Sequence, residues 1–390
     1  MPRSPSLFHY RPRRRRRPPA GRSWWIAAAL APPLALLIYG AIRLALDFAS
    51  SPRGPASAPA PGVRDAAATP TPEPPLSFDW PTPQTNLHDA ASDAVFMPTA
   101  SGRIESALYG SVRTANAGGA LRPSFHEAID IAPTRRGAGG DPLDPVFAAA
   151  DGRVAYLNRH AGNSNYGLYA VLLHRDPLGE IYTLYAHLAG FREGLAPGVT
   201  LRAGEPIGTM GRTPAGIVPT SRAHLHFEIG LIANARFAAW FRAQKLTPDH
   251  GNYNGQNLLG VDPLAVFNRP DPRAPFSMPR YLAELPPAFA LVVKAPRRPD
   301  YFARYPGLWE GPEATGGTIV MTVSEGGVPL SGRPARPEEA AALAKSRSTA
   351  SVLDVSEARL GRNGRRIVVR EGDRWRVGSN GETWLQILLY

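Results

Sequence analysis

The chain has 390 residues, which is enough for two folded domains with additional segments. It contains no cysteine, which excludes disulfide bonds and thiolate metal sites, so any zinc must be held by nitrogen and oxygen ligands. The formal net charge of +12 suggests a nucleic-acid partner, but eight arginines precede Trp24 with no acidic residue among them. The remaining excess is too modest to indicate a DNA-binding surface.

An apolar stretch over residues 24–46 follows the basic tail of residues 1–23. It is long enough for one membrane crossing, and Trp24 and Trp25 stand where an interfacial belt would lie. Because arginines precede the stretch and few follow it, we expect a single-pass anchor in the inner membrane, with the rest of the chain in the periplasm. A cleaved signal peptide is the alternative, although no clean cleavage site follows at once.

Residues 47–96 are rich in proline and alanine, especially near Pro55–Pro61 and Thr69–Pro75. Such a segment cannot bury a core and behaves as an extended, fairly stiff spacer. We therefore expect a linker that lifts a folded domain away from the membrane.

From Met97 the sequence changes to short β-rich runs separated by Gly, Pro, Asn and Asp. Pro145–Leu157 suggests two strands around an Asp-Gly turn, and residues 169–174 and 181–188 suggest a hairpin. Residues 203–211 suggest a further strand. Many short strands at close spacing predict a mainly β domain over residues 97–269, built as an antiparallel sheet or an open, barrel-like sheet.

His224 and His226 stand two residues apart inside an apolar run. In a β-strand both imidazoles would leave one face, while Leu225, Phe227 and Ile229 would point into a core. A metal gives two adjacent imidazoles a reason to be neighbours, since neutral imidazole is a favoured zinc ligand. The alternative is a pair of half-buried histidines with ordinary hydrogen bonds.

Further candidate ligands precede this run. His126 stands four residues before Asp130, and the two can meet on one metal if the segment bends between them. A capping aspartate and a surface histidine are the alternative. His187 ends a predicted strand in which period-two alternation places it on the same face as Thr183 and Tyr185. Taken alone, His187 would be a solvated strand histidine.

Taken together and in this order, the three motifs resemble the lysostaphin-type (LytM-like) family of zinc metalloendopeptidases, with its duplicated-hybrid-motif fold, over about residues 98–268. The resemblance implies that His126, Asp130 and His226 hold zinc, and that His187 and His224 are the catalytic imidazoles. Three protein ligands leave a fourth zinc position open for water, as a catalytic site requires.

The resemblance implies a membrane-anchored enzyme that hydrolyses the peptide cross-links of peptidoglycan by metal-activated water, with stem peptides as its partner. The chief alternative is a catalytically silent LytM-like scaffold that activates another cell-wall hydrolase. Presence of all five site positions favours the enzyme. Nucleic-acid binding through the arginine tail is a third class, and it predicts an affinity that disappears with residues 1–22.

Several positions depart from the family pattern. Ala128 stands where the family has glycine, which costs about 1 kcal/mol if a positive φ is needed there. Residues 231–260 form an insertion with a predicted amphipathic helix over residues 235–244. We expect the insertion to wall or lid the substrate groove. His174 is expected to be structural, and Glu228 to bond its neighbours rather than act as a base.

The C-terminal part begins with a Pro-rich stretch, residues 270–316, which predicts a linker. Residues 317–390 predict a small α+β region with a helix at 337–345 and four strands, at 318–323, 365–370, 374–377 and 383–389. This region shows no candidate chemistry, and we expect it to bind a partner or the cell wall.

Overall fold

The computed structural model describes residues 75–84, 86, 92, 94–117, 120–214, 218–269, 275–312, 317–344 and 348–390. The predicted basic tail, membrane span and most of the predicted linker lie outside these residues. Among the described residues, no helix is both long and apolar enough to cross a membrane. Pro72–Tyr390 forms one compact unit.

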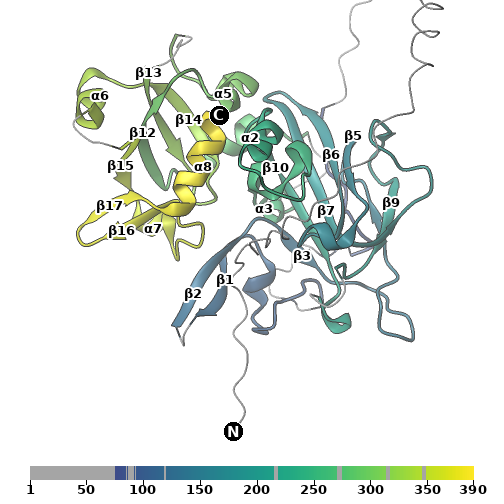
Figure 1. The fold of residues 1–390 in the computed structure, drawn as a ribbon. Helices are drawn as coiled ribbons and strands as arrows, with labels where there is room; N and C mark the ends of the chain where they lie inside the picture. Colours follow the sequence, from purple (N-terminus) through teal and green to yellow (C-terminus); the bar gives the residue numbers. More distant parts are fainter. Residues whose placement is uncertain are drawn as a thin grey trace, which may run out of the picture. The chain divides into compact units, whose positions relative to one another are not determined.

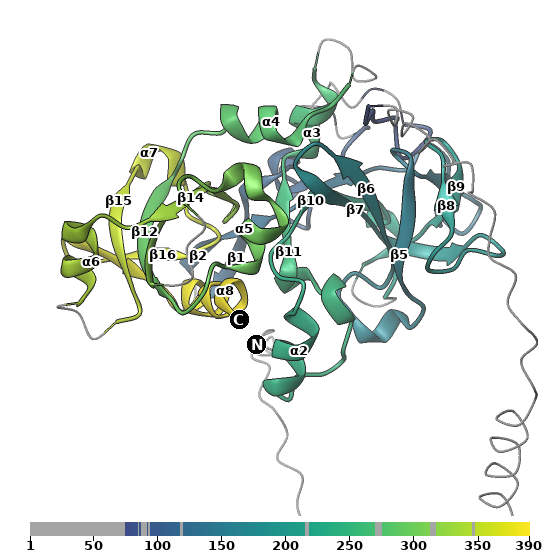
Figure 2. The same ribbon diagram turned by 90° about the horizontal axis from the view of Figure 1, so that it is seen from above.

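A nine-stranded antiparallel sheet forms one side of this unit, on the right in both views (Figure 1, Figure 2). Its main path runs β11-β10-β7-β6-β5-β8; β3 pairs with β10, and β9 pairs with both β7 and β4. Since the path ends at two edge strands, the prediction of a mainly β, open antiparallel sheet is confirmed. The strands are β3 (Ile129–Ile131), β4 (Pro145–Phe147), β5 (Gly152–Asn158), β6 (Leu168–Asp176), β7 (Gly179–Phe191), β8 (Thr200–Leu201), β9 (Pro206–Met210), β10 (Leu225–Ile232) and β11 (Leu258–Val261).

Alternation along the strands separates two apolar clusters. Leu225, Phe227 and Ile229 enter the larger core, as their spacing predicted, while Tyr182 and Leu184 of β7 join a smaller cluster on the other face. The predicted hairpin is confirmed as β6 and β7, which pair along the whole of β6, while the last residues of β7 pair with β9. His226 and Glu228 of β10 therefore lie on the face of the sheet that carries the smaller cluster.

The two strands predicted around the Asp-Gly turn are present as β4 and β5 but do not pair with each other. Strand β4 pairs with β9, and β5 pairs with β6 and β8. The turn therefore links two different parts of the sheet.

Residues 75–84, which the sequence assigned to the linker, pack onto the fold. Leu76 and Phe78 are buried in the large core, and the backbone N–H of Asp79 donates to the carbonyl of Ala149 at 2.6 Å. The predicted boundary at residue 96 is therefore too late, because Leu76 and Phe78 stand among the prolines and pack into the core.

A short 3-10 helix and a separate hairpin precede the first histidine of the site. They are η1 (Ile104–Ala107), β1 (Gly110–Ala117) and β2 (Ala120–His126). His126 is the last residue of β2, so the end of this hairpin fixes its position. Ala128 is not among the described residues with a positive φ, so the strain expected from its Cβ is absent.

The predicted insertion is smaller than residues 231–260, because its two ends are paired strands. Leu231 and Ile232 continue β10 opposite Leu259 and Leu258 of β11. The excursion between them holds α2 (Phe237–Ala243), where a helix was predicted, and the 3-10 turns η4 (Gly251–Tyr253) and η5 (Gly255–Asn257). Phe237, Trp240 and Phe241 of α2 are buried, so the excursion is anchored by its own apolar face.

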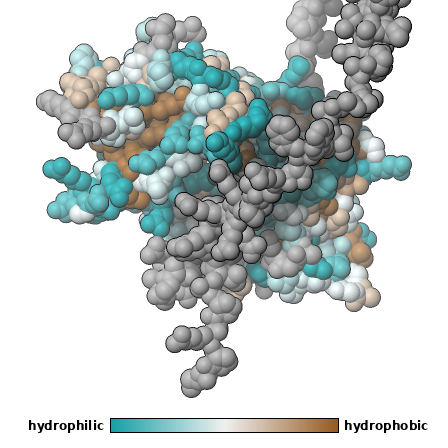
Figure 3. Space-filling model, viewed as in Figure 1, coloured by the Kyte–Doolittle hydropathy of each residue, from teal (hydrophilic) through white to brown (hydrophobic). Residues whose placement is uncertain are grey.

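The C-terminal part contains a second antiparallel sheet in the order β14-β13-β12-β15. Seen from the side of Figure 1, apolar surface gathers over this part of the molecule (Figure 3). Its elements, with the helices and turns around it, are α3 (Pro263–Phe267), α4 (Met278–Glu284), β12 (Phe289–Ala295), α5 (Asp300–Arg304), η6 (Pro306–Leu308), β13 (Gly317–Val323), β14 (Pro329–Pro334), α6 (Pro337–Ala344), β15 (Ala350–Val355), α7 (Glu357–Leu360), β16 (Val368–Glu371), β17 (Arg374–Val377) and α8 (Ser379–Leu389).

Two predictions for this part were wrong. The supposed linker of residues 270–316 contains β12, an inner strand of the sheet, because Phe289, Leu291 and Val293 alternate into the large core. The supposed strand at 383–389 belongs to α8, whose buried side chains follow helical spacing at positions 384, 385, 387 and 388. In both cases local composition fits either structure, and packing against the core determines which one forms.

Candidate metal centre

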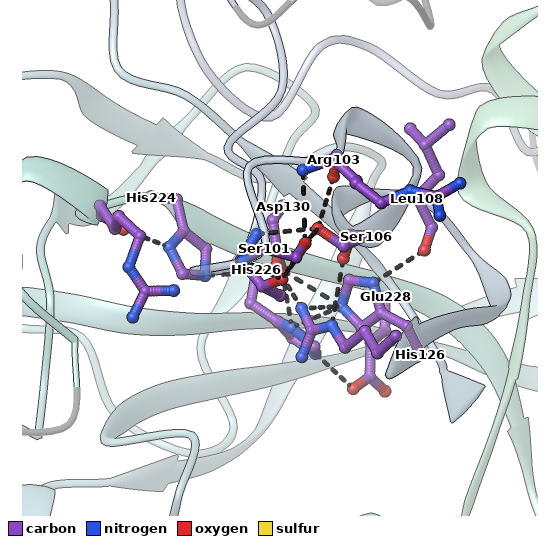
Figure 4. A network of polar contacts seen from close by, with 12 residues as sticks. Ser101, Arg103, Ser106, Leu108, His126, Asp130, His224, His226 and Glu228 are labelled. Carbon is purple, nitrogen blue, oxygen red and sulfur yellow. Dashed lines mark hydrogen bonds and ion pairs between the residues drawn. The ribbon is translucent and has the colours of Figure 1, made fainter. Parts of the chain in front are cut away.

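Strand pairing brings the three predicted ligands together. Asp130 of β3 lies directly opposite His226 of β10 in the sheet, and His126 at the end of β2 closes the group. All three are buried, and their ligand atoms lie within 4.8 Å of one another. Figure 4 shows His126 and His224 on opposite sides of Asp130. The structure thus gathers all three residues of the predicted ligand set.

His126 is oriented by the backbone. Its Nδ1 lies 2.9 Å from the carbonyl oxygen of Leu108, which can only accept, so Nδ1 carries the proton and Nε2 keeps a lone pair. That Nε2 lies 3.2 Å from Asp130 Oδ1 and 3.3 Å from His226 Nδ1. Burial lowers the pKa of His126, which favours the neutral imidazole that a metal requires.

Glu228 fixes the other histidine ligand from behind. Its carboxylate receives His226 Nε2 at 2.9 Å, the Tyr166 hydroxyl at 2.7 Å and the Tyr182 hydroxyl at 2.8 Å. Burial raises the pKa of Glu228, but the hydrogen bonds from these donors outweigh it, so the pKa is lowered. Glu228 therefore bonds its neighbours, as expected, and leaves His226 Nδ1 facing Asp130 at 3.1 Å.

Arg113 of β1 completes the charge balance of the group, and the sequence analysis did not identify it. Its guanidinium donates to His126 Nε2 at 2.8 Å and forms an ion pair with Asp130. Burial opposes protonation of His226, but hydrogen bonds to Asp130 and Glu228 raise its pKa to about 9. Two carboxylates thus face two cations, the guanidinium and the protonated His226.

These residues fit a zinc ion. Zinc carries the same two positive charges as the proton on His226 and the guanidinium of Arg113 together, so replacing both would preserve neutrality in the buried site. Two imidazole nitrogens and a carboxylate oxygen are a donor set that catalytic zinc accepts, and second partners already orient both rings.

The two predicted catalytic histidines lie beside this group. The centroids of the His187 and His224 rings are 4.8 Å apart, and His224 Nε2 lies 3.5 Å from Asp130 Oδ1. Each Nδ1 donates to a carbonyl oxygen, of Thr213 at 2.7 Å and of Arg222 at 2.6 Å, so each Nε2 carries the lone pair. Burial lowers the pKa of His224 and, with the nearby imidazoles, lowers that of His187 to about 3.

Both positions correct the strand argument made from the sequence. His224 precedes β10 by one residue and follows η3 (Thr220–Arg222), so it is not part of the strand. His187 lies inside β7 rather than at its end, with a φ of 62° beside irregularities in its pairing with β6 and β9. This break in the alternation turns its ring toward His226 instead of the face that Tyr185 occupies.

The loop before His224 is held by an arginine that sequence reasoning also missed. The Arg136 guanidinium donates to the carbonyls of Thr220 at 2.9 Å, Ser221 at 3.3 Å and Ala223 at 3.4 Å. Nothing in the sequence distinguishes Arg113 or Arg136 from other arginines, because their partners are far away along the chain.

The other histidines lie outside the candidate metal centre and differ in their burial. His174 is buried between the carbonyl of Asp151 at 2.8 Å and the Thr183 hydroxyl at 2.7 Å, which agrees with its expected structural role. His160 is exposed, and His250 belongs to the insertion and is buried against Tyr156 and Asn163. His9 and His88 lie outside the described residues.

The segment that carries this site matches a known protein family. Residues 124–236 match the model of Peptidase family M23. The predicted resemblance to LytM and lysostaphin is therefore confirmed over this M23 segment, which contains all five site residues. No curated protein sequence matches the chain.

Solved structures are similar to parts of the chain. Csd3 of Helicobacter pylori is 21% identical, covering 40% of this chain and 30% of its own, with a TM-score of 0.24. A zinc-containing peptidase from Vibrio cholerae is 24% identical, covering 35% and 36%, with a TM-score of 0.24. The catalytic domain of lysostaphin from Staphylococcus simulans is 19% identical, covering 42% and 90%, with a TM-score of 0.26. The match spans about a third of the length of the first two proteins.

Proposed function

We propose that the M23 segment is a zinc metalloendopeptidase that hydrolyses peptide cross-links of peptidoglycan. The observation that carries this proposal is the convergence of His126, Asp130 and His226 on one buried point with His187 and His224 beside it. M23 peptidases act on peptidoglycan peptides, which supports the choice of substrate.

His126 Nε2, His226 Nδ1 and a carboxylate oxygen of Asp130 would hold the zinc. When bound, zinc supplies a Lewis acid that polarises a scissile carbonyl and makes water more acidic. The chain contributes the orientation of the ligands, because Leu108 and Glu228 fix the two imidazoles through their other nitrogens.

His187 and His224 would handle the proton. Each presents an Nε2 lone pair on the side of the metal ligands, while its Nδ1 proton is held by a backbone carbonyl. A neutral imidazole in this position can accept a proton from water at Nε2 and then donate it to the developing oxyanion or the leaving amine.

The proposal can be tested with the full chain by metal analysis together with release of cross-link peptides from peptidoglycan. We expect stoichiometric zinc in the wild type and loss of both zinc and hydrolysis in His226→Ala. His224→Ala should keep zinc and lose about 10²–10⁴-fold in rate, the usual contribution of acid–base catalysis. His160→Ala, at an exposed histidine, is the control. Zinc-loaded wild type that cleaves no peptide would refute the proposal, and a chain that neither binds zinc nor cleaves would favour the silent scaffold.

We also propose that residues 24–46 anchor the enzyme in the inner membrane with the M23 segment in the periplasm. The support is the apolar stretch, with eight arginines before it and few after it. Cell fractionation of the full chain should find it in the membrane, and deletion of residues 1–49 should release it. Recovery of a shortened, soluble chain from the periplasm would instead indicate a cleaved signal peptide.

A further inference from the structure

A cavity of about 440 Å³ lies between the insertion and the loop before β6. Its walls are residues 163–166 and 169 on one side and residues between Phe241 and Gln256 on the other. The volume falls in the range of small-ligand pockets, which runs from about 300 to 1,000 Å³. The insertion that departs from the family pattern thus supplies one wall of a ligand-sized space.

The cavity adjoins the metal site through one side chain. Tyr166 lines the cavity, its hydroxyl donates to Glu228, and the centroid of its ring lies 5.3 Å from that of His226. Gly255 of the insertion crosses directly over it, since a Cβ there would lie 2.9 Å from the Tyr166 hydroxyl oxygen. A group bound in the cavity would therefore be one ring away from the predicted zinc ligands.

A buried histidine fixes the walls of the cavity relative to each other. His250 Nδ1 pairs with the Tyr156 hydroxyl at 2.9 Å, and its Nε2 lies 3.1 Å from the carbonyl of Asn163. The ring of Tyr253 stacks on that of Tyr156 at a centroid distance of 5.7 Å. These contacts hold the insertion against the opposite loop, so the walls are set before any ligand arrives.

The lining is polar but carries no aspartate, glutamate, lysine or arginine. Within the described part of the chain, no hydrogen bond engages the exposed side-chain amides of Asn163, Asn165 and Gln256. Tyr166 and Tyr169 add aromatic surface, their ring centroids 5.3 Å apart. This open lining offers an ammonium or carboxylate group no charged partner, whereas an amide group would find donors, acceptors and aromatic surface.

We propose that this cavity binds an uncharged, amide-bearing group of the substrate polymer, next to the bond that is cut. The proposal rests on the proposed function. Two parts of peptidoglycan share this chemistry: the N-acetyl group of a glycan sugar and the backbone amides of neutral peptide residues. The probes below separate the two.

Ligand-observed NMR titration of the full, zinc-loaded chain tests the proposal with two neutral probes. One is the trimer of N-acetylglucosamine, and the other is trialanine with an acetylated N-terminus and an amidated C-terminus. Each has a charged counterpart, the deacetylated sugar trimer and trialanine with free termini. We expect one neutral probe to bind at least about tenfold more tightly than its charged counterpart, since a charge would give up hydration where it touches the walls and find no charged partner there.

The lining is tested with the double variant Asn163→Ala, Gln256→Ala. Both side chains are exposed, so the fold should be unaffected, and loss of two ligand hydrogen bonds should weaken the bound probe about tenfold. The matched control is Gln386→Ala, an exposed amide on α8, which should bind as the wild type does. Binding of neither probe, equal binding of charged and neutral probes, or unchanged binding by the double variant would each overturn the proposal.

The readout does not depend on hydrolysis, so the two proposals can fail separately. A chain that cleaves peptidoglycan but binds no probe keeps the peptidase and loses the cavity site. A chain that binds a probe through Asn163 and Gln256 but never cleaves keeps the cavity site and loses the peptidase.

Discussion

The two sheets of this chain differ in what they bury. Among the described residues, most of the buried polar side chains precede residue 278; Asp130, His226 and Glu228 lie in the nine-stranded sheet, and His126 ends the neighbouring hairpin. Among the residues described from 278 onward, the buried polar side chains are Ser324 and Glu339. The sequence has no histidine after His250. One sheet therefore maintains costly charges in its interior, and the other contributes apolar packing.

Hydrogen bonds and ion pairs connect the two parts. The Tyr305 hydroxyl donates to the carbonyl of Glu180 at 2.9 Å and accepts from the backbone N–H of Ile232 at 3.0 Å. Arg365 forms an ion pair with Glu127, the residue after His126. The C-terminal part thus braces the strands that carry the site. Its expected role in binding a partner or the wall stays a prediction.

The largest effect on stability is expected from a substitution in the apolar C-terminal part. Phe302 is fully buried, and its ring covers Gly332, where a Cβ would lie 2.4 Å from a ring carbon. Phe302→Ala should lower the free energy of unfolding by about 3–5 kcal/mol, measured by chemical denaturation. Leu353→Ala, on an exposed side chain of β15, should cost less than about 0.5 kcal/mol. Zinc bound per folded molecule should be unchanged in both variants. A selective loss of zinc in Phe302→Ala would show that the C-terminal part also maintains the metal site.

The next effect concerns a buried polar group outside the metal ligands. Burial lowers the pKa of His174 from 6.5 to about 4. As the pH falls, the unfolded chain therefore binds a proton before the folded chain does, so the stabilisation is complete above 6.5 and is lost on the way down to 4. The difference corresponds to about 3 kcal/mol.

His174→Gln should remove this dependence, so that its cost relative to wild type shrinks between pH 7 and pH 4 in denaturation curves. His160→Gln, at an exposed histidine, should follow the wild-type pH dependence. If the cost of His174→Gln is the same at both pH values, His174 does not titrate as its burial requires.

A smaller effect is expected at the metal site itself. Since Arg113 bonds His126 Nε2 and Asp130, its guanidinium competes with zinc for the same atoms. Arg113→Gln should bind zinc about tenfold more tightly in equilibrium dialysis, a change of about 1.4 kcal/mol. Arg103→Gln, which removes an exposed cation, is the control. Weaker zinc binding in Arg113→Gln would mean that the arginine orients Asp130 rather than competing.

The smallest expected effect lies at the contact between the two parts. Arg365 is partly exposed, where it pairs with Glu127 and lies over the ring of Phe125 at 5.2 Å from the centroid. Arg365→Ala should cost about 1 kcal/mol in stability, with part of the loss disappearing in high salt. Arg370→Ala, whose pair with Glu357 is more exposed, should cost less. A tenfold loss of zinc affinity in Arg365→Ala would show that bracing by the C-terminal part reaches the metal ligands.

The sequence predicted most of the candidate site because its motifs are short and local. Alternation placed Phe227 in the core and His226 on the polar face, and β10 and β3 then brought His226 opposite Asp130. The same rule misplaced His187, since a single positive φ reverses the face of a strand. No pattern announces such a φ at a residue other than glycine.

The C-terminal part was harder to predict because its elements are defined by packing. Residues 289–295 are apolar enough for a strand but stand among prolines, and residues 383–389 satisfy both a strand and a helix over a short window. Contact with the large core decided both cases. Arg113 and Arg136 were beyond reach for another reason, because their partners come from distant segments.

Glu228 has a consequence for how this protein can change over evolutionary time. Three donors, from His226, Tyr166 and Tyr182, converge on its one carboxylate. Replacement of the carboxylate would leave three buried donors without an acceptor. Replacement of either tyrosine would remove a hydrogen bond from a buried charge that water does not reach. We therefore expect descendants of this chain to keep all four residues or to replace them as a set.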